Sequence, residues 1–184
     1  MRRSTQTICL AVLLTGFLAT SAAAQINIEP GAIAAGGEFG VFFPDEEFEK
    51  AIAIDAFGEY YVAPNFSVRG LFGWTNPGFE NFTEDHFRQV KLLFNGVYYF
   101  QYGNNWLPFV TAGAGAYFVR QTFDDAPDPD SETRGGINFG VGTEYLLGGG
   151  GSVKGELRWD IVSQPTGFPD ATGLSLMFGY KRYF

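Results

Sequence analysis

Apolar and polar residues alternate along almost the whole chain from about residue 35 onward. This two-residue period is typical of β-strands, and no stretch there sustains the 3.6-residue period of a helix. The run 89–101 is the clearest, with Leu92 and Phe94 on one face and Lys91 on the other. The alternation predicts strands over 35–43, 51–62, 66–74, 89–101, 107–122, 136–147, 152–162 and 173–184.

The connections between these runs alternate in length. Tight turns follow the second, fourth and sixth strands, at 63–65, 102–105 and 148–151. The other connections, 44–50, 75–88, 124–135 and 163–172, are longer. Short turns at one end and long loops at the other are typical of up-and-down antiparallel barrels in outer membranes. The sequence therefore predicts an all-β fold, an eight-stranded antiparallel up-and-down transmembrane β-barrel.

Volume decides which face of this barrel points outward. Aromatic residues make up 17% of the chain, with 20 Phe, and the apolar faces carry most of the large side chains. The interior of an eight-stranded barrel is only just wide enough to be filled by side chains. The apolar faces are too bulky to converge there, so we expect them to face lipid. Aromatic residues near strand ends, such as Tyr60, Phe66 and Phe118, fit interfacial girdles.

The opposite face carries charged residues, which we expect inside the barrel. They are six acids and five bases, Glu38, Asp55, Glu59, Arg69, Lys91, Glu144, Lys154, Glu156, Arg158, Asp160 and Lys181. Because an unpaired charge in a confined space is costly, these residues are predicted to form a salt-bridged network that plugs the lumen. An ion or proton path along the same charges is the functional alternative.

The start of the chain has the pattern of a secretory signal peptide. Arg2 and Arg3 precede an apolar run at 8–19, and small residues occupy 21–24. We predict cleavage of 1–24, which leaves a barrel domain at 25–184. The only cysteine, Cys9, lies in the signal, so no disulfide is expected. Loss of the signal moves the net charge from −8 to about −10, which excludes nucleic acid as a partner.

The strand plan, the signal, the stretch LPFVTAGAGAYF at 107–118 and Phe184 at the end resemble small bacterial outer-membrane β-barrel proteins. These include OmpA-type transmembrane domains, OmpX-like proteins and opacity-type surface proteins. The resemblance implies a monomer in the outer membrane with periplasmic termini. It also implies that the barrel-assembly machinery recognises the last strand, with Phe178, Tyr180 and Phe184 as the assembly signal. Arg182 departs from the pattern, since it falls on the lipid-facing side.

Residues that carry chemistry are few. His86 is the sole histidine and is followed by Phe87 and Arg88, so it lacks the His-x-Ser motif of lipid A deacylases. A triad would need a distant serine such as Ser131. The acidic stretch 124–132 lacks the glycine and the spacing of an EF-hand loop, and whether it binds divalent cations stays open. We therefore expect no enzyme, no cofactor and no specific metal site.

The function favoured by these observations is a structural or surface-interaction role. Outer-membrane lipids and lipopolysaccharide are the expected partners, and the loops are expected to contact an extracellular ligand. Loop aromatics are the candidate contact residues, namely Phe48, Phe79, Phe82 and Phe168. A narrow channel for small or apolar solutes is the first alternative, and a lipid A-modifying enzyme is the second.

Overall fold

The computed structural model describes residues 28–45, 50–76, 78–79, 82–100, 105–122, 131–163 and 172–184. The predicted signal peptide at 1–24 lies outside these residues. The strands are β1 (Ile33–Pro44), β2 (Ala51–Ala63), β3 (Phe66–Thr75), β4 (Gly78–Phe79), β5 (Phe82–Tyr99), β6 (Trp106–Thr122), β7 (Ser131–Leu147), β8 (Gly151–Val162) and β9 (Gly173–Tyr183). Within the described ranges, no helix is long and apolar enough to span a bilayer.

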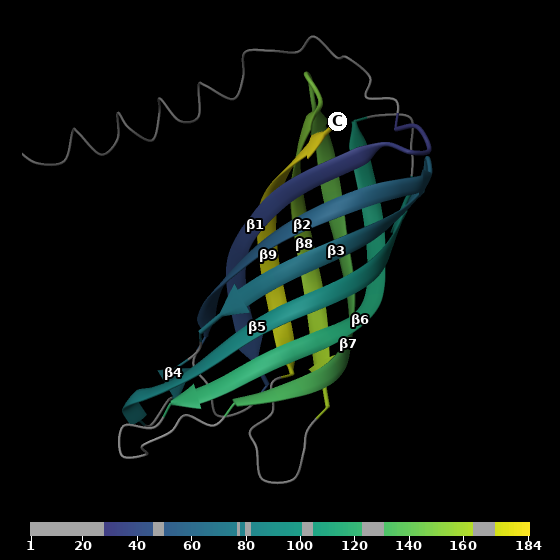
Figure 1. The fold of residues 1–184 in the computed structure, drawn as a ribbon. Coiled ribbons are helices and arrows are strands. Elements are labelled where there is room, and N and C mark those ends of the chain that lie inside the picture. Colours follow the sequence, from purple (N-terminus) through teal and green to yellow (C-terminus); the bar gives the residue numbers. More distant parts are fainter. Residues whose placement is uncertain are drawn as a thin grey trace, which may run out of the picture.

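The sheet closes on itself. β1 pairs with β2 on one side and with β9 on the other, and β3 pairs with β5, each in antiparallel fashion. The remaining neighbours also pair antiparallel, and the two-residue β4 forms a short extension that pairs with β5 near the long-loop end (Figure 1). The other eight strands form a closed antiparallel barrel, as the sequence predicted. Closure leaves no free sheet edge to face lipid.

The structure confirms one predicted turn and corrects the predicted starts of two strands. Residues 148–150 form the tight turn between β7 and β8, where Gly149 and Gly150 adopt φ of 79° and 82°, a left-handed conformation that favours glycine. However, β5 begins at Phe82 and not near 89, and β7 begins at Ser131 and not near 136. The extension of β7 pairs with β6 from Ser131 onward, and that of β5 pairs with β6 from His86 onward and with β4 at Phe82. Backbone pairing therefore continues where the alternation of the sequence has faded.

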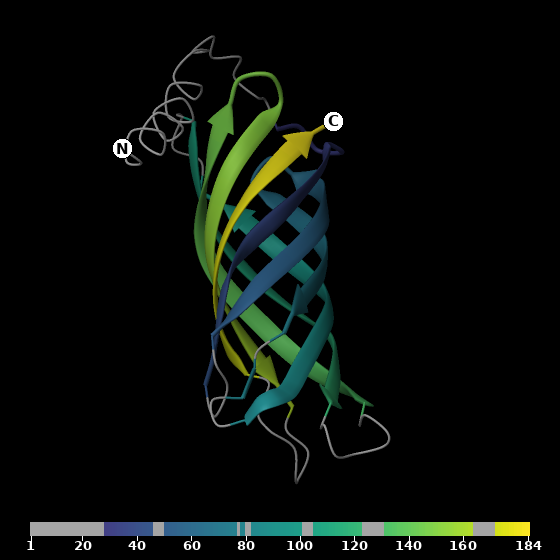
Figure 2. The same ribbon diagram turned by 90° about the vertical axis from the view of Figure 1, so that its left-hand side faces the viewer.

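The orientation of the faces is the predicted one. Phe94 is 69% exposed, and Leu92, Phe139 and Trp159 are exposed as well. Lys91 is 2% exposed, and Arg158 is fully buried. The large apolar side chains of the predicted outer face therefore point away from the barrel axis, while the eleven charged residues of the opposite face point inward. Figure 2 shows the C-terminal end of β9 at the same end of the barrel as the turn between β7 and β8.

The interior also contains large apolar residues beside the charged ones. One cluster consists of Phe57, Leu71, Leu93, Tyr117, Val119 and Val162. A second, towards the short turns, includes Tyr61, Val97, Tyr99, Leu107, Phe109 and Leu146. Glycines make room for these rings: a Cβ on Gly36 would lie 2.6 Å from the ring of Phe57. Small residues opposite large ones let the narrow lumen reach close packing.

Candidate functional site in the barrel interior

All eleven charged residues that the sequence placed inside the barrel are buried there. They come from seven strands, β1, β2, β3, β5, β7, β8 and β9. β8 contributes four of them, Lys154, Glu156, Arg158 and Asp160, at alternate positions. Because successive side chains of a strand point to opposite faces, this spacing puts all four on the lumenal side.

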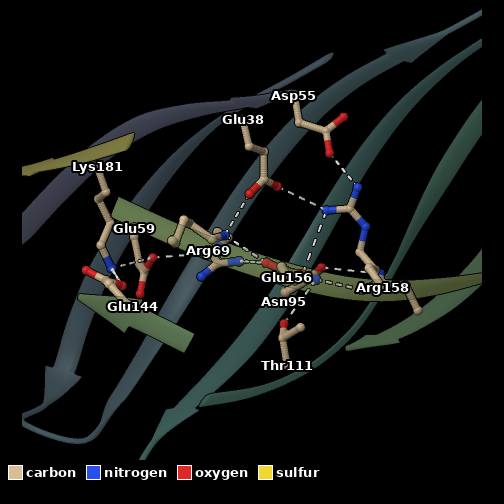
Figure 3. Close-up of polar contacts among 12 residues, drawn as sticks. Glu38, Asp55, Glu59, Arg69, Asn95, Thr111, Glu144, Glu156, Arg158 and Lys181 are labelled. Atoms are coloured by element: carbon tan, nitrogen blue, oxygen red, sulfur yellow. Dashed lines mark hydrogen bonds and ion pairs between the residues drawn. The ribbon is translucent and has the colours of Figure 1, made fainter. Parts of the chain in front are cut away.

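Arg158 lies among four carboxylates. Its guanidinium contacts Asp55 directly and lies 3.3 Å from Glu38. Glu156 and Asp160, its neighbours on β8, lie at 3.9 and 3.8 Å. β1 and β2 supply the two nearer carboxylates, so this arginine links β8 to strands that are not its neighbours in the sheet (Figure 3).

Glu156 is surrounded by cations, just as Arg158 is surrounded by carboxylates. Its Oε2 lies 2.7 Å from Lys154 Nζ and 2.9 Å from an Nη of Arg69. Lys154 also lies 2.8 Å from Glu38, and Arg69 lies 3.2 Å from Glu59. Each of these charges therefore meets at least two opposite charges, which reduces the cost of removing it from water.

Two further lysines extend the network toward the ends of the barrel. Lys181 lies 2.6 Å from Glu144 and 3.5 Å from Glu59. On the other side, Lys91 lies 2.9 Å from Asp160. The charged residues thus form one continuous chain of ion pairs from Glu144 to Lys91, which we call the lumenal network.

Tyrosines complete the lumenal network, and the sequence analysis did not name them as site residues. Lys181 donates to the hydroxyl oxygens of Tyr61 at 2.8 Å and Tyr99 at 3.0 Å. Tyr99 in turn donates to Glu59 at 2.6 Å, and Tyr183 donates to Glu144 at 2.5 Å. Tyr61, Tyr99 and Tyr183 share the parity of the inward charges on their strands, and this was the signal that could have identified them.

Arg134 is a sixth buried base that the sequence analysis assigned to a loop. It lies on the early part of β7, is 2% exposed, and forms an ion pair with Glu132 at 3.1 Å. Its position was missed because the alternation weakens before Gly136. With Arg134, the buried acids and bases of the described interior are equal in number.

The interior is closed at the level of the lumenal network. Arg69, Lys181 and Glu144 have no exposed surface, whereas a water-filled pore would leave such side chains accessible. Apolar clusters pack beside the network, and Lys154 lies 4.7 Å from the ring centre of Phe57. Within the described residues, no group of three or more His, Cys, Asp or Glu is arranged to hold a metal ion.

The other candidate residues are distributed as follows. His86 lies on β5 and Ser131 on β7, with β6 between them. The acidic residues 124–130 and the aromatics at 48 and 168 lie outside the described residues. Phe79 and Phe82 fall in β4 and β5 and not in a loop. The three residues of the expected assembly signal, on or just after β9, are exposed on the outer wall: Phe178, Tyr180 and Phe184.

Solved structures with this architecture include several bacterial outer-membrane proteins. Neisserial surface protein A aligns over 85% of this chain and 98% of its own, with a TM-score of 0.67 and 11% identity. The N-terminal β-barrel domain of Pseudomonas aeruginosa OprF aligns over 85% and 100%, with a TM-score of 0.64 and 13% identity. Ail, the attachment invasion locus protein of Yersinia pestis, aligns over 85% and 100%, with a TM-score of 0.57 and 15% identity. No match is found among curated proteins.

The chain belongs to the family of outer membrane protein β-barrel domains, whose sequence model matches residues 10–181. Its place is the bacterial outer membrane, as the strand plan and the resemblance predicted. At these low identities, the structural matches show a shared fold alone. The role of this particular barrel therefore has to be inferred from its own residues.

Proposed function

We propose that this protein is a monomeric structural and surface-interaction barrel of the outer membrane, with a lumen that does not conduct. The observation that carries the proposal is the closed interior, in which the charges of the lumenal network are buried and paired to one another. The barrel then serves as a rigid support, and the segments that differ most between such barrels, the long loops, carry the interactions.

Energetics favour a closed plug over a conduit. A solute passing the network would have to separate ion pairs such as Arg158–Asp55 and Arg69–Glu156. Breaking one buried pair costs about 3–5 kcal/mol when a charge is left uncompensated. Four cations of the network each lie near two or more carboxylates, namely Arg69, Lys154, Arg158 and Lys181. Opening the lumen there requires breaking more than one pair at once.

We further propose that the short turns and both termini face the periplasm, and that the long loops face outward. The longer strands β5, β6 and β7 extend toward the long-loop end, as in barrels that raise their loops above the membrane. Phe178, Tyr180 and Phe184 on the outer wall would then lie near the periplasmic interface, where the barrel-assembly machinery could reach them.

Planar-bilayer recording tests the closed lumen. The refolded protein, checked for heat-modifiable migration on gels, should give no steady conductance. Phe94→Leu, an exchange on the outer wall, is the matched control and should be equally silent.

The narrow channel is the alternative, supported by the continuity of the ion pairs along the interior. Steady openings in the wild-type barrel that are lost or altered by Lys91→Met or Arg158→Met would establish it and refute the proposal. Openings unaffected by either exchange would place conduction outside the lumenal network and would contradict both.

A further inference from the structure

We propose that a groove in the outer wall, with Arg182 at its end, binds one anionic glycerophospholipid. This inference rests on the proposed insertion of the barrel in a membrane. The groove has a volume of about 520 Å³ and lies across β6, β7, β8, β9 and β1 in the half of the barrel near the short turns. We call it the wall groove and define it by Phe39, Trp106, Tyr145, Gly155, Phe178 and Tyr180.

The wall groove exists because small residues interrupt a surface of large ones. Gly155 pairs with Thr143 on β7 and with Phe178 on β9. The two small residues, Gly155 and Thr143, therefore lie side by side and form the floor of the groove, below the level of the aromatic rings. A Cβ added to Gly155 would meet only the Phe178 ring, at 3.6 Å, which shows that open space stands above this glycine. Tyr145 stands beside this floor and packs edge-on against Trp106, with ring centres 4.9 Å apart.

A polar end adjoins this apolar groove. Arg182 is exposed on the same face of β9 as Tyr180, one pleat nearer the short turns, which is about 7 Å along the strand. Its register partner on β8 is Gly151, and the Tyr180 hydroxyl lies over that glycine. Arg182 and the Tyr180 hydroxyl therefore both adjoin Gly151, at the end of the wall where a long cationic side chain can reach the membrane interface.

Arg182 has no ion pair with any other residue in the described ranges. The other exposed cations of the described wall, Lys50, Arg88 and Arg120, lie toward the long-loop end. Among the described residues, Arg182 is thus the one exposed cation of the wall toward the short turns, on a face where the pattern calls for an apolar residue.

A glycerophospholipid with an anionic headgroup fits both parts. Its apolar acyl chain fits the glycine floor and the aromatic walls of the groove. Its phosphate can accept two parallel hydrogen bonds from the N–H groups of the Arg182 guanidinium. Lipids of this kind have the amphipathic shape that the groove and its end present together, with the charge at the interface and the chain pointing toward the middle of the bilayer. The occupant is therefore a lipid retained at one site of the wall, in addition to the general contact of the wall with lipid.

Tryptophan quenching by brominated lipid tests this proposal. The chain has three tryptophans, Trp74, Trp106 and Trp159, and Trp106 lines the groove. We would prepare a Trp106-only protein (Trp74→Phe, Trp159→Phe) and a Trp159-only protein (Trp74→Phe, Trp106→Phe). Each is reconstituted into phosphatidylcholine vesicles that contain increasing fractions of brominated phosphatidylglycerol. Trp159 is the control, because it is exposed on the wall outside the groove.

Quenching of Trp106 should show that the site binds phosphatidylglycerol about fivefold more tightly than phosphatidylcholine. This factor corresponds to about 1 kcal/mol for one cation near a charged headgroup. Arg182→Gln should reduce this preference to the value at Trp159. Gly155→Leu should weaken the quenching of Trp106, because the side chain fills the floor. Gly58→Leu, at an exposed glycine with open space around it, should leave the quenching unchanged.

Equal preference at Trp106 and Trp159, or a preference that survives Arg182→Gln, would overturn the proposal. A tight interaction without preference for the anionic headgroup would do the same, since it would indicate a neutral lipid. Absence of quenching at both tryptophans would instead show that the barrel is not inserted, which contradicts the proposed function. Labelling of the short turns from outside whole cells would overturn only the proposed orientation and leave the vesicle result intact.

Discussion

Asp55 depends on Arg158 as the only cation with which it forms an ion pair among the described residues. The exchange Arg158→Met keeps most of the side-chain volume and removes the charge. The other three carboxylates around Arg158 retain cations: Glu38 keeps Lys154 at 2.8 Å, Glu156 keeps Lys154 at 2.7 Å, and Asp160 keeps Lys91 at 2.9 Å. The exchange therefore leaves one buried carboxylate, Asp55, without compensation.

The expected cost follows from that single stranded charge. Removing one partner of a buried ion pair costs about 3–5 kcal/mol of folding free energy. In Arg158→Met combined with Asp55→Asn, no stranded charge remains, so the double variant should recover about 2 kcal/mol of the loss, a coupling within the range for residues in direct contact. Asp55→Asn alone should cost less than Arg158→Met, because Arg158 keeps Glu38 at 3.3 Å.

Urea titration of the barrel refolded in lipid vesicles measures these differences, with tryptophan fluorescence and gel mobility as independent signals. Arg120→Met, at an exposed arginine of β6, is the control and should change stability by no more than about 0.5 kcal/mol. If Arg158→Met were as stable as the control, or if Asp55→Asn failed to recover stability in the double variant, the inference that lumenal pairing stabilises the barrel would be wrong.

Three further predictions concern packing, orientation and the end of the network. Gly36→Ala should destabilise the barrel by about 1–3 kcal/mol, because its Cβ would overlap the backbone oxygen of Tyr180 and the ring of Phe57, whereas Gly58→Ala, in open space, should be neutral in the same urea titration. Phe94→Arg should cost about 2–4 kcal/mol in vesicles if its side chain faces the middle of the bilayer, and a neutral result would contradict the outward assignment. Lys181→Met should lower stability and Lys181→Arg should restore part of it, since the cation 2.6 Å from Glu144 is retained; equal losses would mean that packing and not charge matters there.

The alternation of the sequence was sufficient to predict much of this fold. A period of two residues assigns each side chain to one of two faces, so a residue's parity within its run decides whether it points inward. This is why Lys91 and Arg158 could be placed in the lumen, and Phe94 on the wall, without coordinates. The volume argument then chose between the two faces, because an eight-stranded interior cannot hold the larger set.

The pairing of the charges was decided by the tertiary structure. Arg158 meets Glu38 across 120 positions of sequence, and parity alone gives no preference among the six acids. Their meeting depends on strand tilt and stagger, which are set when β1 closes on β9 and which no local pattern encodes. The early start of β7, and with it the burial of Arg134, follows from the length of its partner β6 for the same reason.

The wall groove shows the same division. The sequence by itself determined that Gly155, Phe178 and Arg182 lie on the outer face, since each has the outward parity of its strand. Only the tertiary structure decided that Gly155 pairs with Phe178 and that Arg182 lies beside Gly151, because register between β8 and β9 is a property of two strands and not of either one. The direction of a side chain is determined within its own strand, whereas the identity of its cross-strand neighbour depends on how two strands pair.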